Sequence, residues 1–107
     1  MKQFDEREKA FENKFKRDQE LQFKVQVRRN RLLGLWAGKQ MGLDADSAEV
    51  YAKEVVAADF SEPGDADVMK KVQGDLQAKG IDMSEHLIRK EMDRLLEVAR
   101  EQIFAEN

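Results

Sequence analysis

The sequence predicts an all-α protein, a compact four-helix bundle with a flexible N-terminal arm. Residues that favour helices dominate the 107 positions, β-branched runs are short, and there is a single proline, Pro63. Apolar residues recur at spacings of three and four in four segments, which is the spacing of one buried helix face. The connections are short and favour antiparallel neighbours, and a chain of this length forms one domain.

The first 19 residues are expected to form the arm, and residues 20–107 the bundle. Phe4, Phe11 and Phe15 are spaced by seven and four residues, so on a helix they fall within about 40° of one another. Over residues 1–20, six basic residues balance six acidic ones. This aromatic stripe is too thin to hold the segment folded alone, so we expect residues 1–19 to be disordered or partly helical in the free protein.

Two interpretations of the stripe remain open: an internal packing face, or an arm that binds a groove in a partner. The phase of the pattern bears on this choice. The stripe would continue through polar residues, namely Asp18, Gln22, Gln26 and Arg29. The next apolar residues occupy a rotated face, and they are Leu21, Val25, Leu32 and Trp36.

The first helical pattern extends from about Asp5 to Met41, with an interruption or fraying expected near Phe15 to Gln19, and Gly42 ends it. Asp44 or Asp46 is expected to cap the second helix. Its apolar face consists of Ala48, Tyr51, Ala52, Val55, Val56 and Phe60.

Residues 61–65 are expected to form a turn, because proline fixes φ and glycine admits a left-handed conformation. A third helix is expected from about Asp67 to Lys79, with Gly80 as its stop. Its apolar residues are Val68, Met69, Val72 and Leu76. The fourth helix is expected to start with a capping box of Asp82 and Glu85. Its apolar side consists of Met83, Leu87, Ile88, Met92, Leu95, Leu96, Ala99 and Ile103.

Charge is distributed unevenly. Five basic residues and no acidic one lie between Leu21 and Leu43, whereas residues 44–107 carry 16 acidic residues against eight basic ones. Guanidinium groups match phosphate oxygens and an indole offers a flat face for a base. A weak ATP or ADP site is therefore one hypothesis for Arg28, Arg29, Arg31 and Trp36. The alternative is that Trp36 is part of the core and the arginines are solvated or pair with the acidic helices.

Several classes of protein are disfavoured. The chain has no cysteine and one histidine, His86, so we expect neither a metal site nor a catalytic triad, and not an enzyme. The net charge of −3 disfavours nucleic acid as the main partner. No apolar run is long enough to span a membrane and no signal-peptide pattern is present, so we expect a cytoplasmic protein without membrane insertion.

Four stretches together resemble one known family. They are FDEREKAFENKF, ELQFKVQVRRNRLLGLWAGKQMGL, YAKEVVAADFSEPGDADV and SEHLIRKEM. They are similar to the zeta-subunit family of small alphaproteobacterial inhibitors of F-type ATP synthase. The resemblance implies a four-helix bundle with an N-terminal inhibitory segment. It also implies that this segment enters a catalytic α/β interface as a helix, blocks rotation and inhibits ATP hydrolysis.

The implied partner is the catalytic head, formed by the alpha, beta and gamma subunits, at the cytoplasmic face of the membrane-bound synthase. Phe4, Phe11 and Phe15 would be the apolar anchors, and the rim contacts would be Arg7, Glu12, Lys14 and Arg17. We expect a monomer when free, no cofactor and no histidine-based pH switch in the arm. The alternatives are an adaptor that binds another protein groove through an amphipathic helix, and the adenine-nucleotide sensor.

Overall fold

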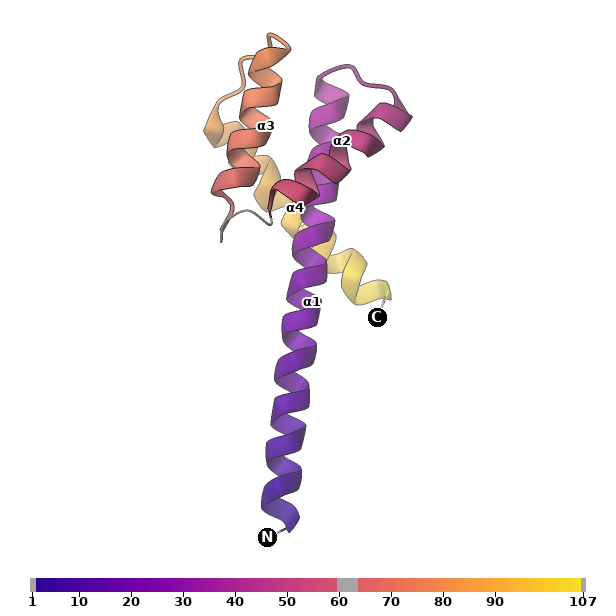
Figure 1. The fold of residues 1–107 in the computed structure, drawn as a ribbon, viewed down its shortest axis with the longest axis vertical. Helices are drawn as coiled ribbons and strands as arrows, with labels where there is room; N and C mark the ends of the chain where they lie inside the picture. The colour runs from indigo at the N-terminus through magenta and orange to yellow at the C-terminus, as the bar shows by residue number, and fades with distance from the viewer. Residues whose placement is uncertain (1, 60–63, 107) are drawn as a thin grey trace.

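In the residues that the structure describes, four α-helices make up the fold (Figure 1). The computed structural model describes residues 2–59 and 64–106, with side chains from residue 13 onward. The helices are α1 (Lys2–Gln40), α2 (Ala45–Ala58), α3 (Ala66–Ala78) and α4 (Glu85–Glu106). No strand occurs within these described ranges, and the predicted all-α, four-helix fold is confirmed.

The molecule is elongated, with extents of 65 × 25 × 21 Å. Helix α1 is the central element, because it packs against each of the other three helices. The shorter helices gather around its C-terminal half, while its N-terminal half projects away from them (Figure 1). The fold is therefore a small bundle built on one end of a long helix.

Helix α1 is continuous over 39 residues, so the expected interruption near Phe15 to Gln19 is wrong. Neither glycine nor proline occurs before Gly34, and oppositely charged residues such as Glu20 and Lys24 stand four apart, a spacing that supports a helix. A polar surface is thus compatible with an unbroken helix when one end is anchored. The mobility expected for residues 1–19 stays a prediction.

Glycine ends α1 and α3, as the sequence predicts. Gly42 and Gly80 both have φ of +77°. Beyond each glycine the chain turns back onto the helix, where the Leu43 amide donates to the Gly38 carbonyl and the Ile81 amide donates to the Leu76 carbonyl, both at 2.9 Å. These turns satisfy carbonyl groups that the helix end would leave unpaired.

The core joins all four helices. Its fully buried members include Leu33 of α1, Val55 of α2, Val72 of α3 and Ile88 of α4. A second, smaller cluster forms where Val25 of α1 meets the C-terminal half of α4. Leu32 of α1 packs against both clusters, and both include residues of α4.

Most predicted core positions are confirmed, including the whole apolar face of α3. One prediction is wrong: Leu87 is 53% exposed, because the buried face of α4 runs through Ile88. Val56, Met83 and Leu96 are only half-buried. Phe60 lies outside the described residues.

The helix caps differ in one place from the prediction. The Asp44 carboxylate accepts a hydrogen bond from the Ser47 amide at 2.7 Å, so Asp44 rather than Asp46 caps α2. Helix α4 begins at Glu85, where the Ser84 hydroxyl accepts from the Leu87 amide at 3.2 Å. Ser84 therefore takes the capping role expected of Asp82, and the predicted capping box with Glu85 is wrong.

Helices α1 and α2 approach closely through small residues. A Cβ atom placed on Gly34 would lie 2.5 Å from the Ala52 Cα atom, and one on Gly38 would lie 3.1 Å from the Ala48 Cβ atom. Two glycines four residues apart thus face two alanines four residues apart. This pair of helices crosses at backbone contact distance, which brings α2 against the C-terminal half of α1.

Candidate functional site

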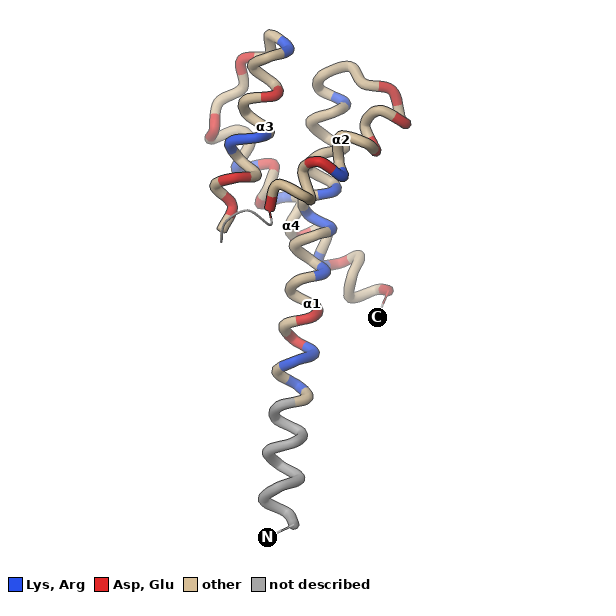
Figure 2. Tube along the Cα trace, viewed as in Figure 1, with Lys and Arg blue, Asp and Glu red and all other residues tan. Residues whose placement is uncertain are grey.

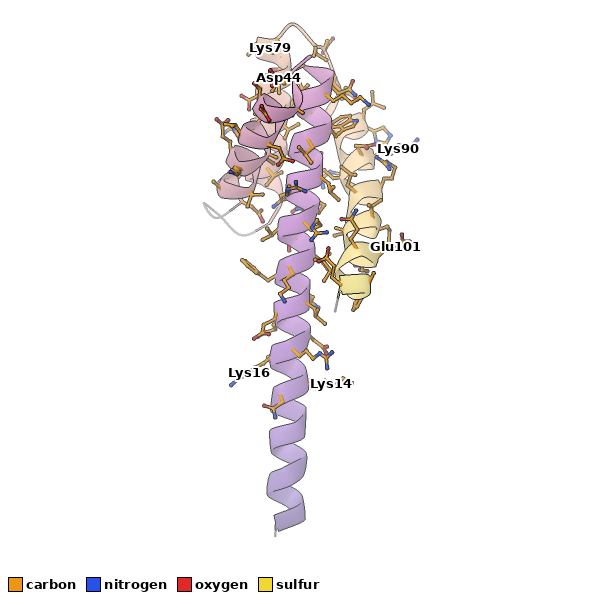
Figure 3. All side chains as sticks on the ribbon, turned by 90° about the vertical axis from the view of Figure 1, so that its right-hand side faces the viewer. Lys14, Lys16, Asp44, Lys79, Lys90 and Glu101 are labelled. Atoms are coloured by element: carbon orange, nitrogen blue, oxygen red, sulfur yellow. The ribbon has the colours of Figure 1, made fainter. Side chains whose placement is uncertain are left out.

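The described part of α1 that precedes the bundle is a bare helix. Every side chain from Asn13 to Glu20 is exposed, and Lys14 and Lys16 extend away from the ribbon in Figure 3. Phe15 is 55% exposed, so it is not part of the core of this chain. The predicted contacts Phe15, Lys14 and Arg17 therefore lie on an accessible surface.

Four of the predicted contact residues, Phe4, Arg7, Phe11 and Glu12, lie where the structure describes the helix backbone but not the side chains. The common phase of Phe4 and Phe11 with Phe15 follows from the spacing of the sequence along the continuous α1.

The face of α1 that carries the aromatic stripe continues along the helix into a groove beside α4. Asp18, Gln22, Gln26 and Arg29, the positions that continue the stripe, all line a hollow of about 490 Å³. Leu96, Arg100 and Phe104 of α4 form its opposite wall, and Phe104 is 57% exposed. The face of α1 that carries Phe15 therefore continues into an open groove and not into the core.

Arg28 connects α1 to the end of α4. Its guanidinium donates to the Gln102 side-chain oxygen at 2.8 Å and to the Glu106 carboxylate at 3.0 Å. The side chain of Arg28 is 25% exposed. Two acceptors one helical turn apart on α4 thus engage one planar cation.

Arg29 is buried and pairs with Asp65, the residue that precedes α3. Two guanidinium nitrogens donate to the two Asp65 carboxylate oxygens, at 2.7 and 3.2 Å, and Nε donates to the Asn30 side-chain oxygen at 3.0 Å. The hydrogen bonds and charge of Arg29 hold the pKa of Asp65 below its ordinary value. This pair secures the start of α3 against α1.

Arg31 points in a third direction, toward α2, where it pairs with Glu49 at 2.8 Å. Trp36 is partly buried against the main core. The structure does not bring the guanidinium groups of Arg28, Arg29 and Arg31 together, and this geometry agrees with the alternative that they pair with the acidic helices. Nucleotide binding at these residues stays a prediction.

The charge pattern therefore has a structural role. Lysine and arginine colour the middle of α1 in Figure 2, and acidic residues from the following helices lie around it. The basic stretch of α1 is matched by Glu106, Asp65 and Glu49, which belong to different parts of the acidic segment. The uneven charge distribution along the chain thus helps to assemble the bundle.

No cluster of His, Asp and Glu suited to a metal occurs in the residues that the structure describes. The pKa of Tyr51 is raised by burial and by the hydrogen bond that its hydroxyl donates to Asp75, an interaction that links α2 to α3. None of the helices in the described ranges is sufficiently long and apolar to cross a bilayer.

Sequence reasoning missed several residues that shape this site. Gly34 and Gly38 carried a detectable signal, because small residues four apart indicate a close helix crossing. The partners of Arg28 carried none, since Gln102 and Glu106 lie 74 and 78 residues away. The groove residue Phe104 could not be identified from the apolar face of α4, because it lies outside that face.

The described residues form a small all-α bundle that presents an exposed helix. The family model of ATPase inhibitor subunit zeta matches residues 1–102, and the chain belongs to that family. The family is one of inhibitor subunits and not of enzymes, which assigns the chain to inhibition of ATP synthase.

A solved structure supports the fold. This chain is similar to a protein whose structure was determined by NMR in solution, with 45% sequence identity and a TM-score of 0.72. The match covers 81% of this chain and 99% of that one. No match was found among curated proteins.

Proposed function

We propose that the N-terminal part of α1 enters a catalytic α/β interface of F-type ATP synthase as a helix, reaches toward the gamma subunit and blocks the rotation that accompanies ATP hydrolysis. The bundle remains outside the interface. The observation that carries this proposal is the exposed helix before the bundle, with Phe15 outside the core of its own chain.

The length of the projecting segment suits a deep interface. Residues 2–20 span about 28 Å at 1.5 Å per residue in a helix. The bundle adds bulk at one end of this segment, because α2, α3 and α4 gather around the other half of α1 (Figure 1). The narrow helix could therefore enter a cleft to a depth that the wider bundle limits.

Attachment to the bundle also lowers the free-energy cost of binding as a helix. A detached peptide would need a helix nucleus, at about 4 kcal/mol for a nucleation constant near 10⁻³. Helix α1 supplies that nucleus, because its anchored half is already folded.

ATP hydrolysis by the cognate catalytic head tests the proposal. We expect the full chain to inhibit, and a chain that lacks residues 1–16 to lose inhibition while its melting temperature changes little, because the described residues up to Glu20 are exposed. The double change Phe11→Ala and Phe15→Ala removes about 3–6 kcal/mol of burial, enough for a loss of affinity of at least about a hundredfold.

Leu87→Ala is the matched control, since Leu87 is exposed to nearly the same extent as Phe15 but lies in the first turn of α4. It should inhibit like the native chain. Full inhibition by the chain without residues 1–16 would overturn the proposal, whatever the family.

A further inference from the structure

We propose that Arg28, Gln102 and Glu106 are positioning residues that fix the direction in which the exposed part of α1 leaves the bundle. The consequence for inhibition rests on the proposed function, whereas the geometric part of the proposal does not. We call these three residues the α1–α4 clamp.

The clamp restrains both distance and orientation. One nitrogen of the Arg28 guanidinium donates to Gln102 at 2.8 Å, and another lies 2.9 Å from a Glu106 carboxylate oxygen. Because the guanidinium is planar, these two contacts on successive turns of α4 define an angle between the helices. A lysine in place of Arg28 is flexible and carries one point charge, so it would not restrict the angle between the two helices.

The clamp lies where α1 is otherwise thinly supported. Leu21 and Val25 contact Ala99 and Ile103 of α4 in the smaller apolar cluster. Helix α2 meets α1 closely only farther along, at Gly34 and Gly38. Between Leu21 and Arg29, the contacts that hold α1 include this cluster, the clamp and Asp65, which contacts Gln26 and Arg29.

A long helix amplifies small angular errors at its base. Asn13 lies about 22 Å from Arg28 along the helix and Lys2 about 39 Å, at 1.5 Å per residue. A tilt of about 10° at Arg28 displaces these positions by roughly 4 and 7 Å. A helix that samples many directions binds a narrow cleft more weakly, because binding restricts it to one direction and costs conformational entropy.

The absence of cysteine allows a direct test on the full chain. Spin labels are attached to cysteines introduced at the exposed positions Asn13 and Lys53, and the distribution of distances between them is measured. In the native background we expect a narrow distribution. The double change Gln102→Ala and Glu106→Ala should broaden it and weaken inhibition roughly threefold to tenfold, the effect of losing a part-exposed charged contact.

Two further variants separate positioning from general stability. Glu49→Ala removes the other 2.8 Å arginine pair on α1, toward α2, and should change neither the distance distribution nor the inhibition. Exchanging the two side chains, Gln102→Glu together with Glu106→Gln, keeps both acceptors on Arg28 and should leave the distance distribution and the inhibition as in the native chain. Melting temperatures are compared so that unfolding is recognised.

An unchanged distance distribution in the folded double variant overturns the proposal, and so does a broadened distribution with unaltered inhibition. If the native chain fails to inhibit the catalytic head, the proposed function fails instead. In that case the distance distribution still decides whether the clamp sets the direction of α1.

Discussion

Gly34 sets the distance between the two helices that pack most closely. A Cβ atom at this position would meet the backbone of Ala52, which cannot move aside as a flexible side chain can. Gly34→Ala should therefore lower the free energy of unfolding by about 1–3 kcal/mol, as overpacking does, although alanine favours the helix. Urea denaturation measures the change.

Gly74 provides the control, because it is an exposed helical glycine of α3 with open space around it. Gly74→Ala should raise the free energy of unfolding by about 0.5–1 kcal/mol. A Gly34→Ala protein as stable as the native chain would refute the close crossing of α1 and α2.

Asp65 gives the stability of the protein a dependence on pH. Its pKa is lower in the folded protein, because of Arg29, than its ordinary value of about 3.9. The stabilisation is thus fully present above the unfolded pKa and is lost as the pH falls through the folded pKa. Asp65→Asn should destabilise the protein at pH 7, and its difference from the native chain should shrink below about pH 4. A difference that stays constant on acidification would show that ionisation of Asp65 is irrelevant.

At the scale of elements, the start of α4 depends on Ser84. Its hydroxyl accepts from the Leu87 amide, one of the amides that a helix start leaves unpaired. Ser84→Ala should cost about 1 kcal/mol of stability, and Asp82→Ala, at the position the sequence favoured, should cost little. Thermal unfolding of the two variants compares them, and the reverse order of effects would restore Asp82 as the cap.

Local signals predicted the elements well, and tertiary contacts account for the rest. The glycine stops and the face of α3 follow from periodicity and backbone conformation within a few residues. The continuity of α1 past Phe15 was not predicted, because a helix with so polar a surface is unstable in isolation. In the structure this helix is anchored in the core at Leu33. The exposure of Leu87 depends on how α4 is rotated about its axis against α1. Leu87 and Ile88 are both apolar, so the sequence of α4 does not decide which of them faces the core.

The candidate site divides in the same way. The accessible aromatic position Phe15 was predictable from phase, because the rotated apolar residues that follow it contact α4. The separation of Arg28, Arg29 and Arg31 was not, since adjacent basic residues on one helix diverge to partners that lie between 18 and 78 residues away.

At the scale of the whole molecule, the bundle anchors one long helix, α1. Helix α1 is shared by the core and by the projecting segment, so the folded end supplies a helix nucleus for the other end. The acidic segment matches the basic stretch of α1 from several sides, and the clamp ties the base of the projecting segment to α4.

Whether the projecting helix enters the catalytic interface is most directly tested by a photo-crosslinking amino acid in place of Phe15, with the chain bound to the catalytic head under full inhibition. We predict a crosslink to the alpha or beta subunit, and its loss when an excess of unlabelled native chain competes. Complete inhibition without any crosslink from position 15 to either subunit would contradict the account.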